Sequence, residues 1–254
     1  MLKISIITVC YNSATTIKDT ITSVASQSYP CVEHIIVDGA SKDSTMDIVK
    51  ASSSVTNFIS EPDNGIYDAM NKGIGMVTGD VIGTLNADDF YADENVLSEV
   101  AEIFQNPEID ACYADLVYVA QTDTKKILRY WKSRVFSPGL FKRGWMPAHP
   151  TFFVRRHLYE ELGGFDLDYK LQADFELTMR FLEIYRINAV YIPRIIVRMR
   201  VGGASNQSLS NIIKGNIEAY NACKKNHLSI LPIFNILKIL SRVPQFFSRP
   251  KNFS

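Results

Sequence analysis

The chain has 254 residues, an apolar fraction of 46%, and equal numbers of acidic and basic side chains, 27 of each. These values are typical of a folded globular protein with a sizeable core, and the zero net charge argues against general nucleic-acid binding. The opening apolar run at 4–9 is too short and too polar at its flanks for a signal peptide, so we expect a cytoplasmic protein.

Short β-branched runs alternate with amphipathic stretches through the first hundred residues. We expect strands at 4–9, 33–37, 55–59 and 81–85, separated by helices. This alternation is typical of an α/β fold with a doubly wound, mostly parallel sheet. Further along the chain we expect strands at 111–120 and 126–131, a loop at 137–150, helices at 156–162 and 171–185, and a strand at 189–192.

Two strand ends deliver polar groups to the same edge of this sheet. The first leads into Thr8, Tyr11 and Asn12, and the second ends at Asp38. An aspartate at such an edge can accept a hydrogen bond from a base or a ribose hydroxyl, and Tyr11 offers a flat face for stacking. We predict a nucleotide contact at Asp38, because it lies too early to cap the helix that follows.

A tight turn at 61–65 leads into a helix whose first turn carries Asp68 toward the same edge. This helix contains Gly73 and Gly75, and each interior glycine costs about 1 kcal/mol relative to alanine in an exposed helix. We therefore expect a close backbone approach at both glycines.

The fourth strand is followed directly by Asn86, Ala87, Asp88 and Asp89. Ligands of open α/β sheets collect beyond the carboxyl ends of the strands, where carboxylates and substrate phosphates can share a Mg²⁺ or Mn²⁺ ion. We predict a divalent-cation site at Asp88 and Asp89. The alternative is that one of them caps the helix expected at 94–105.

In combination, these segments resemble glycosyltransferase family 2, and the resemblance covers roughly residues 1–205. The matching stretches are 5–12, 38–45, 61–74 and 85–89. The resemblance implies a GT-A fold with a nucleotide-sugar-binding half at 1–110, an acceptor half at 111–205, and inverting, metal-dependent sugar transfer. The turn and helix at 61–74 look particularly like the branch that builds bacterial capsule and exopolysaccharide repeat units.

The resemblance also implies site residues by position. Asp88 falls on the metal-binding aspartate of the D-x-D signature, although this chain has Asn86 at the first position and Met70 where many members carry arginine. A UDP-sugar is the donor that the family favours. The donor contacts implied are Thr8, Tyr11, Asn12, Asp38, Asp68, Asn71, Asn86, Ala87 and Asp88.

Inverting transfer needs a carboxylate that deprotonates the acceptor hydroxyl. Asp174 matches the family's acidic motif on the acceptor side, with Ala173 in place of the usual glutamate. An acid that stabilises a helix N-terminus is the structural alternative for Asp174, and Glu176 is the competing base.

Two further residues resemble the family's acceptor-side segments. We predict that Arg200, beside two glycines, binds the diphosphate from a loop that closes over it; pairing with a surface carboxylate is the alternative. His149 is a candidate metal ligand, or else a loop histidine held by hydrogen bonds.

The C-terminal tail at 206–254 is expected to be helical, basic and amphipathic. Its polar residues recur at intervals of three and four, in the order Asn235, Lys238, Arg242, Gln245 and Arg249. No apolar stretch is long enough to span a membrane, so we predict a helix in the interface at the inner face of the cell membrane. Packing on the domain or in a homodimer is the alternative.

The expected partners are a nucleotide-sugar and a saccharide or lipid-linked acceptor, without nucleic acid. A sugar-1-phosphate nucleotidyltransferase would share the sheet and the metal, but segment 9–14 lacks the glycine-rich phosphate loop of such enzymes. A non-catalytic nucleotide-sugar-binding subunit is the third possibility, and the presence of Asp38, Asp88 and Asp174 argues against it.

Overall fold

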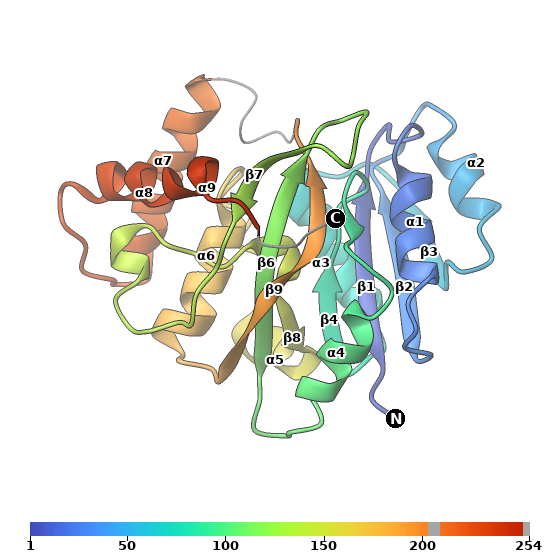
Figure 1. Ribbon diagram of the computed structural model, residues 1–254, viewed down its shortest axis with the longest axis horizontal. Coiled ribbons are helices and arrows are strands. Elements are labelled where there is room, and N and C mark those ends of the chain that lie inside the picture. Colours follow the sequence, from blue (N-terminus) through green and yellow to red (C-terminus); the bar gives the residue numbers. More distant parts are fainter. Residues whose placement is uncertain (203–208, 251–254) are drawn as a thin grey trace.

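The computed structural model describes residues 1–202 and 209–250, so the expected boundary between 205 and 206 lies outside the described residues. Within them, one mixed sheet is covered by helices on both faces (Figure 1). The strands are β1 (Ile4–Cys10), β2 (Val32–Asp38), β3 (Asn57–Ser60), β4 (Val81–Thr84), β5 (Phe90–Tyr91), β6 (Ala111–Val119), β7 (Ile127–Trp131), β8 (Phe153–Arg155) and β9 (Ala189–Arg200). The helices are α1 (Ile17–Ala25), α2 (Thr45–Lys50), α3 (Ile66–Met76), α4 (Val96–Ile103), α5 (Arg156–Leu162), α6 (Ala173–Met179), α7 (Leu209–Lys225), α8 (Phe234–Arg242) and α9 (Pro244–Phe247). Short turns of other helix types are η1 (Phe141–Arg143), η2 (His149–Thr151) and η3 (Arg180–Ile184).

The first four strands are parallel, in the order β3-β2-β1-β4, as the alternating pattern predicts. Every residue of β1 is buried, including the polar Ser5 and Thr8 within its mainly apolar run, because helices cover both faces of a doubly wound sheet. The expected bounds of these strands agree with the structure to within two residues. Their carboxyl ends therefore meet at one edge, where Cys10 lies opposite Asp38 in the register of β1 and β2.

The second half of the sheet is mixed rather than mostly parallel. β8 is antiparallel to β4 and β6, and β7 is antiparallel to β6, whereas β9 runs parallel to β6. β9 continues to Arg200, eight residues beyond the predicted end at 192. Pro193 interrupts the pattern and the pairing with β6 shifts register near Asp115, so the prediction stopped too early although Ile195, Ile196 and Val197 continue the β-branched run.

A close backbone approach is present at one of the two α3 glycines. A Cβ atom on Gly73 would lie 2.4 Å from Cγ2 of Ile7 in β1, so only glycine lets α3 pack on the sheet there. A Cβ atom on Gly75 would meet nothing within 4 Å, and the expectation for Gly75 was wrong.

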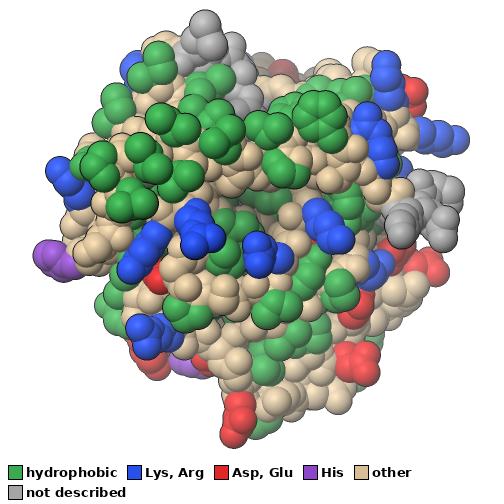
Figure 2. Space-filling view, turned by 60° about the vertical axis from the view of Figure 1, so that its left-hand side comes forward, with side chains coloured by type: hydrophobic (Ala, Val, Ile, Leu, Met, Phe, Trp, Pro, Cys, Tyr) green, Lys and Arg blue, Asp and Glu red, His purple; other side chains and the backbone are tan. Residues whose placement is uncertain are grey.

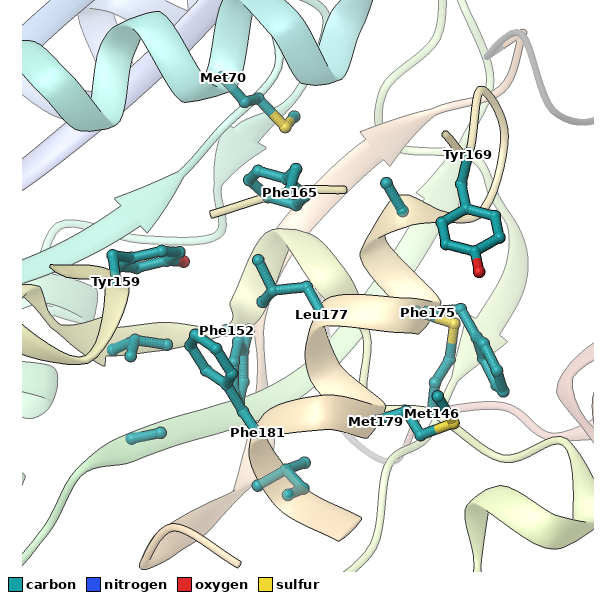
Figure 3. Packing of buried hydrophobic residues seen from close by; sticks show 14 of the residues in the cluster. Met70, Met146, Phe152, Tyr159, Phe165, Tyr169, Phe175, Leu177, Met179 and Phe181 are labelled. Atoms are coloured by element: carbon teal, nitrogen blue, oxygen red, sulfur yellow. The ribbon is translucent and has the colours of Figure 1, made fainter. Parts of the chain in front are cut away.

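The largest core cluster joins the two halves of the chain. It contains Met70 from α3 and Phe175 and Leu177 from α6, which pack together with Phe165 from the loop between α5 and α6 (Figure 3). Phe234 of α8 belongs to the same cluster and is fully buried. Burying a phenylalanine contributes about 1.5–3 kcal/mol, so the first turn of α8 helps to hold the domain together.

His34 in β2 is a buried histidine that should make the stability of the fold depend on pH. Its Nε2 lies 3.0 Å from Oγ1 of Thr8, and burial lowers the pKa of His34 from 6.5 to about 3. Below pH 6.5 the unfolded chain therefore binds a proton that the folded chain does not, and stability falls as the pH falls toward 3. We expect the wild type to lose roughly 2 kcal/mol more than His34→Gln between pH 7.5 and 5, at about 1.4 kcal/mol per pH unit. Urea unfolding at both pH values measures this, and equal losses in the two proteins would contradict it.

Candidate active site

The end of β2 places Asp38 beneath the sheet edge. Its carboxylate is fully buried and accepts hydrogen bonds from the Ser41 backbone N–H at 3.0 Å and the Ser60 hydroxyl at 2.6 Å, as well as from the Ser41 hydroxyl. The structure therefore shows Asp38 holding the loop after β2. Its contact with a nucleotide stays a prediction.

The loop after β1 is tied to this same loop. Asn12 has a positive φ of 48°, its N–H donates to Oγ of Ser41 at 2.8 Å, and its Oδ1 accepts from the N–H of Lys42 at 2.8 Å. Tyr11 is 62% exposed, and a Cβ atom on Gly39 would lie 3.4 Å from its ring. Tyr11 is therefore open to a stacking ligand, whereas Asn12 orders the loop that presents it.

Thr8 lies one layer deeper than expected. It is fully buried, and its hydroxyl is paired with His34. Ala87 is likewise buried, in the small core cluster of α1 and the end of β1. Neither side chain reaches the surface of the edge, and the donor contacts expected at Thr8 and Ala87 stay predictions.

The segment after β4 carries one buried carboxyl group, that of Asp89, and a buried amide oxygen. Both carboxylate oxygens of Asp89 and the Oδ1 atom of Asn86 are buried and accept no well-formed hydrogen bond from the described residues, although the backbone N–H of Arg200 and the side chain of Asn86 lie near enough to lower the pKa of Asp89 in part. Burial raises the pKa of Asp89 well above its ordinary value, and the charge of Asp88 raises it further. Burial also raises the pKa of Asp88, and the positive charge of Arg200 partly offsets this rise. Orphaned oxygen acceptors next to a second carboxylate fit a hard divalent cation.

Arg200 lies at the end of β9, not on a loop that could close over a ligand. It is 5% exposed, pairs with the carboxylate of Asp19 at 2.5 Å, and donates to the backbone carbonyl of Asp88 at 2.9 Å. Its guanidinium also lies over the ring of Phe90 at 5.0 Å. The pairing with a surface carboxylate was the alternative, and here Arg200 anchors the segment that carries Asp88.

The two α3 residues predicted to contact the nucleotide-sugar both make hydrogen bonds within the chain. Asp68 accepts from the backbone N–H of Asn64 at 2.9 Å. The amide of Asn71 pairs with both the N–H and the carbonyl of Phe165, each at 2.8 Å. Asn71 therefore fastens the loop before α6 to α3. Its contact with a nucleotide-sugar stays a prediction.

Asp174 lies in the first turn of α6 and lines a cavity of about 160 Å³. Its Oδ1 accepts from the hydroxyl of Tyr67 at 3.1 Å and from the backbone N–H of Phe175 at 2.8 Å. Burial, and then the charge of Asp174, raise the pKa of Tyr67, so this hydroxyl stays protonated and donates. The same cavity is lined by Asn86 and His149, which brings the end of β4 and the acceptor half together.

His149 and Glu176 lie differently from Asp174. The ring of His149 packs edge-on against Phe165 at 5.9 Å, and burial lowers the pKa of His149, opposed by the charge of Asp174. No three metal-ligating side chains gather within the described ranges, so His149 is not assembled with Asp88 and Asp89, and its role as a ligand stays a prediction. Glu176 is buried in an ion pair with Arg180 at 2.9 Å.

The cavity also contains residues that sequence reasoning left in the tail. Lys238 of α8 is fully buried, donates to the side chain of Gln172, and lies over the ring of Phe175 at 5.0 Å. Burial lowers the pKa of Lys238 to about 7, and the charge of Arg242 adds to this. Both cations line the cavity that holds Asp174. Their spacing of four residues was visible in the sequence, but not the direction in which they point.

Comparisons with known proteins agree with these features. A family model described as Glycosyl transferase family 2 matches residues 5–163. A PGL/p-HBAD biosynthesis glycosyltransferase of Mycobacterium bovis is 29% identical over 208 residues, which cover 80% of this chain and 78% of that protein.

Two solved structures have a similar fold. S. aureus TarS 1–349 in complex with UDP-GlcNAc matches with a TM-score of 0.66 and 17% identity, covering 89% of this chain and 65% of that one. The mannosyltransferase PcManGT from Pyrobaculum calidifontis, in complex with GDP-Man and Mn²⁺, matches with a TM-score of 0.66 and 18% identity, covering 95% and 69%. At these identities the likeness concerns the fold alone.

Proposed function

The chain belongs to glycosyltransferase family 2, and from this membership we propose that it transfers a sugar, with inversion, from a UDP-sugar to a saccharide or lipid-linked acceptor. The family makes it a glycosyltransferase with a GT-A-like α/β fold, not a nucleotidyltransferase. The observation that carries the proposal is the cavity lined by both Asn86 and Asp174, because donor and acceptor must meet at such a junction.

The donor lies along the carboxyl edge of β1, β2 and β4. Its base stacks on the exposed ring of Tyr11, and the loop that Asp38 and Asn12 order encloses the ribose. Asp88 and Asp89 would hold a Mn²⁺ or Mg²⁺ ion, which would supply positive charge at the diphosphate leaving group. Arg200 keeps the backbone at Asp88 in position.

Asp174 acts as the general base. Tyr67 and the N–H of Phe175 both donate to its Oδ1, which leaves Oδ2 to accept the proton of the acceptor hydroxyl. The acceptor oxygen then forms its bond to the anomeric carbon as the bond to the diphosphate oxygen breaks on the opposite face. The electron pair leaves with the diphosphate.

For the biological setting, we extend the resemblance of segment 61–74 and propose a role in assembling a bacterial capsule, exopolysaccharide or O-antigen repeat unit. The Mycobacterium bovis relative is named for PGL/p-HBAD biosynthesis, so the pathway proposed here differs from the one in the name of that relative. Transfer takes place in the cytoplasm, at the inner face of the cell membrane.

A panel of nucleotide-sugars tests the function. The wild-type protein should bind one UDP-sugar in preference to other nucleotide-sugars when Mn²⁺ is present, and EDTA should abolish the preference. Calorimetry measures the affinities, and release of UDP with a saccharide acceptor measures turnover. If no nucleotide-sugar of the panel supports turnover, the non-catalytic alternative is favoured instead.

The orientation of α8 and α9 supports contact with a membrane. None of the described helices is long and apolar enough to cross a bilayer. Lys238 and Gln245 of the polar stripe face the domain, so the apolar side chains point outward and form a band beside a row of basic residues (Figure 2). The exposed apolar residues of α7, α8, α9 and the segment before α8 are Ile212, Ile213, Ile217, Leu231, Ile233, Ile236, Ile239, Leu240, Val243, Phe246 and Phe247. An apolar band flanked by cations matches the surface of an anionic bilayer.

The band predicts a point-mutation result. Ile236 and Phe247 are 58% and 81% exposed, so the double variant Ile236→Asn/Phe247→Ser should fold normally. We expect it to bind vesicles of anionic phospholipid at least about 10-fold more weakly, since burying each side chain is worth about 1.5–3 kcal/mol. Phe58→Asn, on edge strand β3 at the far end of the sheet, is the matched control. Unchanged vesicle binding together with loss of a wild-type dimer would favour the homodimer instead.

A further inference from the structure

A second, larger cavity of about 620 Å³ lies between β7, η1 and the helices α8 and α9. We propose that it binds the phosphate or diphosphate of a lipid-linked acceptor. This inference rests on the proposed transferase function and names the class of its acceptor.

The charged side chains that line the cavity are all positive. Four cations line it, Lys132, Arg134, Arg143 and Arg242, and none of the described lining residues is acidic. None of these four side chains makes a hydrogen bond or ion pair with any part of the chain that the structure describes. Guanidinium groups without carboxylate partners around a cavity of this size are suited to bidentate binding of phosphate oxygens.

The carboxylate that acts electrostatically on Lys132 does not neutralise the cavity. Asp115 is 1% exposed, and it already accepts from the hydroxyl of Tyr130 at 2.5 Å, the N–H of Ser133 at 2.7 Å and the hydroxyl of Tyr191 at 2.8 Å. The positive charge is felt further inside, because Arg242 helps to lower the pKa values of both Lys238 and Arg129. A bound anion would relieve this repulsion.

The position of the cavity gives the anion its role. Trp131, Met146 and Arg242 line both this cavity and the one that contains Asp174, so the two spaces adjoin. α9 forms the outer wall, held by Arg129, which donates to Gln245 and stacks against Phe246 at 4.9 Å. The outer face of α8 and α9 is the exposed apolar band. One acceptor molecule could therefore place its lipid chain on that band, its phosphate in the basic cavity and its sugar next to Asp174.

Binding of inorganic pyrophosphate in EDTA tests the site without turnover. The two tryptophans of the chain, Trp131 and Trp145, both line the cavity, so intrinsic fluorescence reports its occupancy. We expect Arg134→Gln/Arg143→Gln to weaken pyrophosphate binding at least about 10-fold, since each charge-assisted contact is among the stronger hydrogen bonds. Lys142→Gln, next to Arg143 but outside the lining, is the matched control and should bind as the wild type does. Equal affinity in the double variant and the control would overturn the site.

A kinetic comparison separates this inference from the proposed function. The double variant should raise KM at least about 10-fold for a saccharide acceptor linked to a prenyl diphosphate, without changing KM for the donor or for the same saccharide as a neutral alkyl glycoside. If the double variant and the wild type have the same KM for the diphosphate-linked acceptor, the acceptor role of the cavity is overturned. Absence of transfer by wild type to either acceptor would instead contradict the proposed function, whatever the result with pyrophosphate.

Discussion

Asp174→Asn should lower the single-turnover rate of sugar transfer by about 10²–10⁴ at saturating donor, which is the usual worth of a general base. The amide keeps the shape of the side chain and an oxygen that accepts from Tyr67 and from the N–H of Phe175. It cannot take the proton of the acceptor hydroxyl. Donor affinity should therefore stay within a few fold of the wild-type value while the chemical step fails.

Two control variants show whether this loss belongs to the base. Glu176→Gln should reduce stability but not the rate, because Glu176 is buried in its ion pair with Arg180 and receives a hydrogen bond from Asn226 at 3.1 Å. Tyr67→Phe removes the donor to Asp174 and should change the pH profile of the rate rather than donor binding. Near-normal turnover in Asp174→Asn would move the base to another carboxylate.

The first half of the fold could be predicted from sequence because its information is local. The buried parallel strands read as mainly apolar runs, and β1, β2 and β3 are each followed directly by a helix. The second half depends on distant pairing. β5 and β8 are two and three residues long and exist only through their partners β9, β4 and β6. Such strands carry no periodic signal of their own.

The candidate site divides in the same way. The sequence placed Asp88, Asp89 and Asp174 on the right elements, since strand ends and helix starts follow from local pattern. It could not give the direction of side chains that long-range partners decide. Asn71 turns to the backbone of Phe165, which lies 94 residues further along the chain. Arg200 turns to Asp19, which lies 181 residues before it.

The tail shows why an amphipathic period does not by itself assign a buried face. A spacing of three and four residues predicts one polar and one apolar side of a helix, and the usual expectation is that the apolar side packs inward. In α8 the polar side packs inward, because the cavity beside it offers Gln172 as an acceptor for Lys238. The apolar side is left for another surface.

Asp88→Asn should abolish Mn²⁺-dependent binding of UDP while leaving the fold intact. A neutral amide is a poorer ligand for a hard cation, and it cannot offset the charge of a diphosphate. The backbone carbonyl of Asp88, which Arg200 holds, is unaffected by the substitution. We expect at least about a 10²-fold loss of UDP affinity measured by calorimetry with Mn²⁺, since 1.4 kcal/mol corresponds to a factor of ten. Binding measured in EDTA should be the same in variant and wild type.

Asp89→Asn is the matched comparison, because it removes a carboxylate whose two oxygens are both buried and unpartnered. In the metal-free protein this change should raise the thermal midpoint, since the Asp89 carboxyl must either be buried as a charge or take up a proton at its raised pKa, and an amide does neither. If Asp89 is also a ligand, the stabilisation that Mn²⁺ and UDP give to the wild type should shrink in this variant as it does in Asp88→Asn. Unchanged Mn²⁺-dependent UDP affinity in Asp88→Asn would contradict the metal assignment, and full stabilisation of Asp89→Asn by Mn²⁺ and UDP would leave Asp88 as the sole carboxylate ligand of this pair.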